Sequence, residues 1–158
     1  MISVELVGDR EVIARFEAMP ANARSNIART VAKLGFETEA LTKRKLSGQV
    51  LNVGTGLLRS SINTKTTADS NSATATIGTN VKYAGIHEFG GTIHVPEIRP
   101  KSARALMLPI GGQVIFRMSA RAHDVHMPER SFLRSALNEM RPKIQSEIAE
   151  AVGQTLRE

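Results

Sequence analysis

The residues that could do acid–base or metal chemistry gather at two places in the chain. His87-Glu88 lies shortly before His94, and the stretch His123-Asp124-Val125-His126 follows downstream. Neutral imidazoles and carboxylates are good zinc ligands, and two histidines at positions i and i+3 can share an ion on a helix. A metal-dependent hydrolase that uses His87, Glu88, His123 and His126 is therefore one function that these residues would allow.

The spacing of these histidines argues against such a site. The segment around His123 leads into Met127-Pro128 and is expected to be extended, and residues i and i+3 of a strand point to opposite faces. His87-Glu88 continues as Phe89-Gly90-Gly91 and does not complete the HExxH motif of zinc proteases. We interpret the histidines as surface or interface residues and predict no metal and no other cofactor.

Motifs for covalent catalysis and for phosphate binding are also missing. No serine lies in a G-x-S-x-G motif, and the chain has no cysteine, so it offers neither a thiol nucleophile nor a disulfide. Gly54-Thr-Gly56 lacks the Gly-Lys-Ser/Thr ending of a P-loop, and we interpret it, like Gly78-Thr79, as a turn. The sequence therefore predicts a protein that is not an enzyme.

The chain is basic, with a net charge of +6 at pH 7. Clustered Lys and Arg neutralise phosphates, and the run Lys43-Arg44-Lys45 motivates a basic DNA-binding module as the alternative function. The run falls at the expected end of a helix, however, where cations also interact favourably with the helix dipole. With five Phe, one Tyr and no Trp, a stacking platform for single-stranded nucleic acid is nearly excluded.

Length and composition favour one domain that spans residues 1–158. A hydrophobic content of 41% in 158 residues supports a single core and is too little for two comfortable domains. The N-terminus has no basic leader, and no apolar run is long enough to cross a bilayer. We therefore expect a soluble protein that is made and folded in the cytoplasm, with no membrane partner.

Hydrophobic spacing predicts helices towards both ends of the chain. A short strand over 2–7 precedes a first helix that ends near Met19-Pro20. A longer helix follows to about Leu46, and the C-terminal helix, which opens near Pro128, should be kinked or split by Pro142. The two apolar stripes consist of Ile27, Val31, Leu34, Thr38 and Leu41 and of Leu133, Leu137, Met140, Ile144, Ile148, Val152 and Leu156.

Strands are expected between these helices. One hairpin has strands at 61–67 and 73–79. A second pairs 105–110 with 113–118 across Gly111-Gly112, which permits the positive φ of a tight turn. The fold class is therefore α+β, an antiparallel sheet packed against the long N-terminal helix and the C-terminal helix. The aromatic side chains expected in or near the core are Tyr83, Phe89 and Phe132.

The interval 91–127 carries little helix signal. Proline and glycine punctuate it, and a central apolar run is flanked by cations. Long segments of this kind often form a protruding hairpin or binding loop. We expect an arm that is mobile in the monomer and ordered by its neighbours. Its candidate partner contacts are Arg99, Lys101, Arg104, Leu106, Met107 and Leu108.

Three separated motifs give the chain a family resemblance. They are Gly54-Thr-Gly-Leu-Leu-Arg-Ser-Ser-Ile62, Ile77-Gly-Thr-Asn-Val-Lys-Tyr-Ala-Gly-Ile-His-Glu-Phe-Gly90 and Met127-Pro-Glu-Arg-Ser-Phe-Leu-Arg134. From about Gly54 to Met140 the chain resembles the tail-completion or virion-morphogenesis proteins of tailed bacteriophages. The motif residues are Gly54, Gly56, Leu58, Arg59, Tyr83, Glu88, Phe89, Gly90, Pro128, Arg130, Phe132 and Leu133.

The resemblance implies a structural protein of the virion, located in the tail or neck and assembled in the host cytoplasm. Proteins of this family complete the tail or join it to the head as a ring, which we expect to be a hexamer here. The implied partners are further copies of the chain, neck or connector proteins, and the tail-tube or tail-terminator protein. Phage DNA would pass close to such a ring.

The resemblance also implies structural roles within the motifs. Tyr83-Ala84 and Glu88-Phe89-Gly90 should end a strand and turn the chain. Glu88 is then expected to bond the backbone or an arginine such as Arg130 or Arg134. Ser131 stands where proline is common in the family, which leaves the start of the following helix less rigid.

Overall fold

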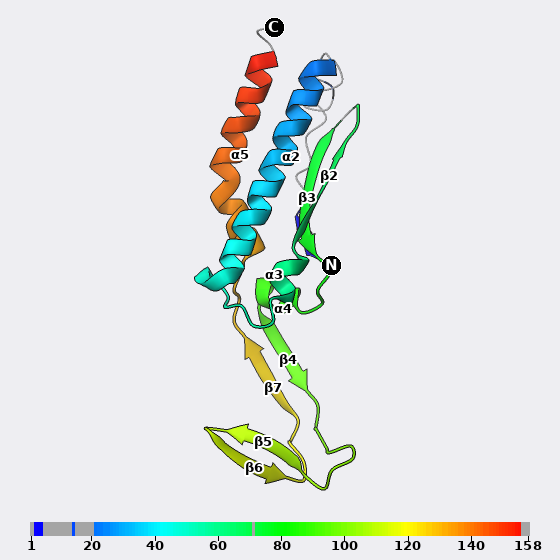
Figure 1. The fold of residues 1–158 in the computed structure, drawn as a ribbon, viewed down its shortest axis with the longest axis vertical. Helices are drawn as coiled ribbons and strands as arrows, with labels where there is room; N and C mark the ends of the chain where they lie inside the picture. The colour runs from blue at the N-terminus through cyan, green and yellow to red at the C-terminus, as the bar shows by residue number, and fades with distance from the viewer. Residues whose placement is uncertain (1, 5–13, 15–20, 71, 156–158) are drawn as a thin grey trace.

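The computed structural model describes residues 2–4, 14, 21–70 and 72–155. Two long helices, α2 (Ala21–Arg44) and α5 (Leu133–Thr155), run antiparallel side by side (Figure 1). A small sheet lies beside α2, and a narrow arm leaves the end of this body where α2 ends and α5 begins. The α+β fold class is confirmed. The helix expected to end near Met19-Pro20 lies outside the described residues.

The two long helices pack through their predicted apolar stripes. Leu34 and Leu41 of α2 form a buried cluster with Ala136 and Met140 of α5. Thr38, between the two leucines, is also buried, and its hydroxyl donates to the Leu34 carbonyl at 2.8 Å. Burying apolar area of this kind is the main stabilising contribution to such a helix pair.

Helix α5 differs from the sequence prediction in its start and in its buried face. It begins at Leu133 rather than near Pro128. Of the two effects predicted for Pro142, a kink or a split, the split does not occur, because the helix continues through this residue. Leu137, which the stripe predicted to be buried, is half-buried, and Ala136 occupies the buried position instead. The stripe therefore passes through Leu133, Ala136 and Met140, in steps of three and four.

Ion pairs line the outer edge of the helix pair. Lys33 Nζ lies 3.0 Å from Glu147 Oε2, and Lys143 Nζ lies 2.7 Å from Glu37 Oε2. The hydrogen bond from Lys33 lowers the pKa of Glu147, and the contact with Glu37 raises the pKa of Lys143. Both lysines remain largely exposed, although Glu37 Oε2 itself is closed to solvent. Ion pairs with exposed members add little stability, so these pairs mainly fix the helix register.

The three-stranded sheet has the order β1-β3-β2 and is antiparallel throughout. Its strands are β1 (Ile2–Val4), β2 (Asn63–Ala68) and β3 (Ala73–Thr79), so the first predicted hairpin is confirmed. Helix α2 approaches the sheet closely at Gly35, where an added Cβ would lie 2.8 Å from Ala75 Cβ. Glycine at this position lets the helix rest on the sheet.

A second core closes the end of the body from which the arm leaves. Its buried residues are Leu46, Ile62, Ile77, Ala84, Phe132 and Leu133. A turn, η1 (Lys45–Gln49), in which Ser47 and Gly48 leave the helical conformation, and two short helices, α3 (Leu57–Ser61) and α4 (Ala84–Phe89), surround it. The expectation that Tyr83-Ala84 and Glu88-Phe89-Gly90 end a strand is wrong, because α4 occupies this segment. Phe132 is buried as predicted, but Tyr83 and Phe89 are 42% and 60% exposed.

The arm consists of two small antiparallel sheets placed one after the other. Strands β4 (Gly91–Val95) and β7 (His123–Met127) pair next to the body. Ile98 and Ala120 form a bridge beyond them, and β5 (Leu106–Ile110) and β6 (Gln113–Arg117) form the distal hairpin (Figure 1). Gly111 and Gly112 adopt φ of 60° and 81° at its turn, which confirms the second predicted hairpin.

No described helix is both long enough and apolar enough to cross a membrane.

Candidate assembly site

A buried carboxylate ties the root of the arm to helix α5. Glu88 of α4 is only 2% exposed. Its Oε2 accepts the backbone N–H groups of Phe132 and Leu133, each at 2.9 Å, and its Oε1 accepts the N–H of Arg134 at 2.9 Å. The first N–H groups of a helix have no partner within it, and a negative charge suits the positive end of the helix dipole. Glu88 therefore caps α5 from a different element.

The predicted contact between Glu88 and the backbone is confirmed, and the arginine alternative is not used. The guanidinium of Arg134 pairs with Glu129 and lies over the Phe89 ring, 5.9 Å from its centroid. Ser131, at the position where the family commonly has proline, donates its hydroxyl to Glu88 Oε1 at 2.7 Å. This departure from the family pattern therefore adds a hydrogen bond to the cap.

The segments that enter and leave the arm are in direct contact. Gly90 has φ of +69°, and an added Cβ there would lie 2.8 Å from the backbone N of Glu129 and 3.0 Å from the Met127 carbonyl oxygen. The Arg130 N–H donates to the His87 carbonyl at 2.8 Å. Of the motif residues here, Pro128 and the Arg130 side chain are exposed. Together with the Glu88 cap, these contacts fix the direction in which the arm leaves the body.

The arm histidines have local partners. His94 Nδ1 lies 2.7 Å from Asp124 Oδ1 across the β4–β7 ladder, and His126 Nδ1 lies 3.4 Å from the Thr92 hydroxyl. His123 Nδ1 lies 3.1 Å from the Arg121 carbonyl. Over the described part of the chain, no group of three or more His, Cys, Asp or Glu residues is arranged to hold a metal. The four-donor cap also occupies Glu88, the carboxylate that the hydrolase hypothesis requires.

The distal hairpin exposes an apolar face. Met107 pairs with Phe116 in the β5–β6 register, and their side chains are 65% and 66% exposed. Directly opposed residues lie on the same face of a hairpin, so Pro109 and its partner Val114 belong with them. Of the predicted partner contacts, Met107 lies on this face. Leu106 and Leu108 are half-buried and lie on the opposite face, because successive residues of a strand point to opposite sides. The expectation from the sequence missed Phe116 and Val114, although strand alternation could have found them.

The cations near this hairpin are exposed and only partly paired. Arg99 Nη2 lies 3.1 Å from Glu97 Oε2, and this hydrogen bond lowers the pKa of Glu97. Among the residues that the structure describes, Lys101 and Arg104 have no ion pair. These three predicted contact residues flank the apolar hairpin on its N-terminal side.

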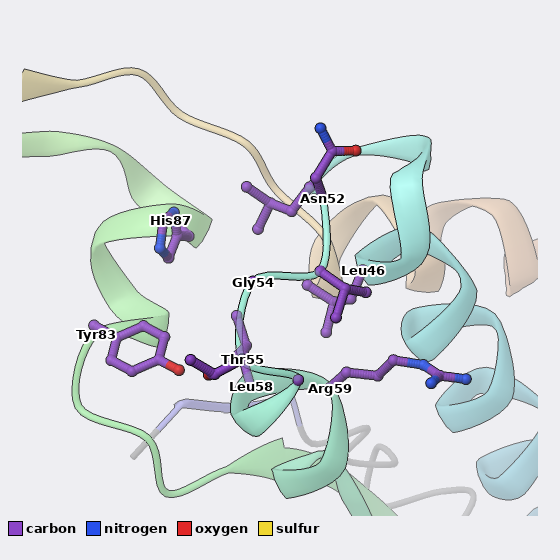
Figure 2. Close-up of a pocket in the computed structure, with 11 residues that line it drawn as sticks. Leu46, Asn52, Gly54, Thr55, Leu58, Arg59, Tyr83 and His87 are labelled. Atoms are coloured by element: carbon purple, nitrogen blue, oxygen red, sulfur yellow. The ribbon is translucent and has the colours of Figure 1, made fainter. Parts of the chain in front are cut away.

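A pocket of about 250 Å³ lies on the body beside the arm root (Figure 2). Leu46, Leu51 and Leu58 contribute aliphatic side chains to it, and Tyr83 and His87 form its other wall. The Tyr83 and His87 rings meet edge to face, with centroids 6.0 Å apart. Figure 2 shows Arg59 extending away from these two rings. Sequence reasoning did not predict the pocket.

The sequence motifs converge at this end of the body. Gly54 and Gly56 lie in the loop that lines the pocket, and Gly56, with φ of +79°, leads into α3. The second motif supplies Tyr83, His87 and the Glu88 cap. The third supplies the start of α5 that Glu88 holds. The motif residues therefore build the junction between body and arm.

The basic run that motivated DNA binding is largely paired. Lys43 Nζ lies 2.6 Å from Glu39 Oε1, and Lys45 Nζ lies 2.7 Å from Glu139 Oε2. Arg44 is exposed at the end of α2. Lysines held by carboxylates are less available to phosphates, so this run gives the DNA-binding alternative little support.

Comparison with known proteins gives one match. The family model described as the phage virion morphogenesis family matches residues 33–157. This range includes all three sequence motifs, the arm and the whole of α5. No curated protein and no solved structure matches the chain significantly.

Proposed function

Because the chain belongs to the phage virion morphogenesis family, we propose that it is a structural neck protein that completes the tail or joins it to the head. In this proposal it acts without catalysis, as a homo-oligomeric ring, most simply a hexamer. The ring contacts neck or connector proteins on one side and the tail-tube or tail-terminator protein on the other. Such a ring requires surfaces that repeat by rotational symmetry.

The exposed apolar hairpin at the end of the arm is the observation that carries this proposal. Soluble proteins rarely leave contiguous large apolar side chains in water, and such patches commonly mark interaction sites. Met107 and Phe116 are about two-thirds exposed, and their hairpin, β5–β6, lies at the end of the arm away from the body (Figure 1). Assembly would remove this face from water, which favours association by about 25 cal/mol per Å² of apolar area.

The arm root supports the same function. A surface that is held in its bound direction before contact loses less conformational entropy on binding. Glu88 and the contact between Arg130 and His87 hold both ends of the arm against α5 and α4. The hairpin is therefore presented in a defined direction, as a ring with a fixed geometry requires.

Deleting the distal part of the arm tests the proposal. Residues 99–117 are replaced by a short Gly-Ser linker, which is feasible because Ile98 and Ala120 already bond each other through two 2.9 Å backbone hydrogen bonds. The shortened protein should fold but fail to enter particles, and electron microscopy should show unjoined heads and tails. Normal tail completion by the shortened protein would contradict the proposal.

A double variant in the same arm provides the matched control. His123→Gln with His126→Gln changes two exposed side chains of the hypothetical hydrolase site without altering the apolar hairpin. Assembly and infectivity should remain close to normal. If particles incorporated the folded double variant but lost infectivity, chemistry at these histidines would be indicated, and the structural role would be insufficient.

A further inference from the structure

The pocket beside Tyr83 and His87 has an aliphatic part in an otherwise mixed lining. Its volume of about 250 Å³ is below the roughly 300–1,000 Å³ of typical small-molecule sites. Leu46, Leu51 and Leu58 supply the aliphatic part. Val53, which is exposed, is also part of the lining. A pocket of this size and lining suits one or two large apolar side chains of a protein partner.

The pocket also has polar side chains in its lining, from Asn52, Thr55 and Arg59. Polar groups that an interface covers need hydrogen-bond partners, and leaving them unpaired is costly. An occupant of the pocket should therefore bring hydrogen-bonding groups as well as apolar side chains.

The distal hairpin of the arm has both properties. Residues 105–116 contain no charged side chain. Phe116 and Met107 project from one face as a cross-strand pair. Each strand of a two-stranded sheet also has one open edge, where backbone N–H and C=O groups are unpaired. Such an edge offers hydrogen-bonding groups to the polar side chains of the pocket lining.

The hairpin that fills the pocket must come from another chain. Figure 1 shows the arm leading away from the body, so the hairpin lies far from the pocket at its own arm root. The exposed apolar residues of the hairpin face, Met107, Val114 and Phe116, offer less than the roughly 800 Å² per partner of a stable interface. One such contact is therefore weak by itself. In a closed head-to-tail ring, however, every subunit gives one hairpin and receives another, so two contacts hold each subunit.

We propose that the pocket lined by Tyr83 and His87 receives the β5–β6 hairpin of a second copy of this chain. The inference rests on the proposed function, because it assigns the self-contact of the ring. The contact is heterologous, with the hairpin of one subunit entering the pocket of the next. Phe116 and Met107 fill the apolar space, and the hairpin edge meets the polar side chains of the lining.

Disulfide trapping with the full chain tests this contact directly. The protein has no cysteine, so every disulfide must come from introduced thiols. Val114→Cys, which keeps Phe116 and Met107, and Val53→Cys are purified separately, mixed and oxidised, and the linked 53–114 dimer should be the main product. Ser146→Cys, on the exposed side of α5, replaces either partner as the control and should give much less. A 53–114 yield no higher than this control, or a chain that stays monomeric at its highest soluble concentration, would overturn the proposal.

Self-association measured by sedimentation gives a second, independent test. Phe116→Ser should weaken it by about ten-fold or more, since it removes the largest side chain of the hairpin face. Phe36→Ser is matched in chemistry and in exposure but lies on α2, and it should have little effect. Equal effects of the two changes would overturn the proposed contact.

If trapping fails while arm deletion still blocks particle assembly, the docking is wrong and the neck function stands. If trapping succeeds while arm-deleted protein completes tails, the proposed neck function is wrong instead.

Discussion

At the scale of single residues, Glu88 joins parts of the molecule that are distant in sequence. A buried carboxylate loses its hydration, and this cost is offset only where donors replace the water. Here three backbone N–H groups and the Ser131 hydroxyl do so. The charge thus holds α4, the root of the arm and the start of α5 in one arrangement.

Replacing Glu88 should therefore destabilise the whole fold. Glu88→Ala leaves three backbone donors without acceptors at a buried helix end. We expect the free energy of unfolding to fall by about 2–4 kcal/mol, as for loss of a charged cap and its hydrogen bonds. Reversible denaturant unfolding measures this change. Glu129→Ala, which removes an exposed partner of Arg134, should cost under about 1 kcal/mol. Equal effects of the two substitutions would show that the Glu88 cap stabilises the fold no more than an exposed ion pair does.

Gly90 should tolerate no side chain, in contrast to Gly54. The φ of +69° at Gly90 and the 2.8 Å approach of the Glu129 backbone N leave no room for a Cβ. Gly90→Ala should cost about 1–3 kcal/mol, because both backbone strain and a backbone clash arise. Gly54 has nothing within 4 Å of an added Cβ, so Gly54→Ala should change stability by less than about 0.5 kcal/mol. Thermal unfolding of both variants checks the contrast, and a harmless Gly90→Ala would contradict it.

The sequence predicts some of these residue roles and misses others for a physical reason. The contact between Glu88 and the backbone was one of two alternatives that the family resemblance implied, the other being an arginine. That the carboxylate lies at the start of α5 follows only from the folded structure. The prediction that Tyr83 and Phe89 lie in or near the core was wrong. Large aromatic residues usually lie in the core, but Tyr83 lines the pocket and Phe89 lies at the root of the arm. The pocket at His87 has no local signal. It exists only because the 51–56 loop packs next to α4 in three dimensions.

At the scale of elements, periodicity predicts the long helices and both hairpins but not α4. Helices α2 and α5 each carry an apolar stripe over several turns, so their spacing is unambiguous. Helix α4 has six residues and includes Gly85, so neither length nor propensity indicates it. Its position is set by tertiary contacts, with Ala84 in the core and Glu88 on α5. Strand pairing across 91–127 also depends on long-range contacts.

The corrected stripe of α5 predicts which leucine matters most. Leu133 is 2% exposed in the core at the arm root, whereas Leu137 is half-buried. Leu133→Ala should reduce the free energy of unfolding by about 2–5 kcal/mol, as core truncations do. Leu137→Ala should cost clearly less, because part of its surface already contacts water. Denaturant unfolding of the two variants provides the measurement. A larger loss for Leu137→Ala would mean that the original sequence-based stripe is correct.

At the scale of the whole molecule, the body and the distal arm differ in how they are stabilised. The three buried clusters of the described residues draw on α2, α5, the β1-β3-β2 sheet and the junction. They include no residue between 96 and 122. Alternation in the sequence predicts strands in this interval but cannot say whether they join the central sheet. In the structure, β4 pairs with β7 and extends away from the body, so the strands beyond this pair do not join the central sheet (Figure 1).

Removing the distal arm should therefore leave the stability of the body nearly unchanged. The deletion of 99–117 removes exposed side chains and a hairpin that pairs only with itself, and it keeps the Ile98–Ala120 bridge that closes the gap. No buried cluster loses a member, so the free energy of unfolding should change by less than about 1 kcal/mol. The denaturant dependence of unfolding should decrease only slightly, because little buried surface is lost. Denaturant unfolding followed by helical circular dichroism measures both quantities, and the deletion protein should retain the cooperative transition of the full chain.

A decrease of several kcal/mol in the free energy of unfolding would show that the arm stabilises the body. Failure of the shortened protein to enter particles would then reflect misfolding rather than a missing contact surface.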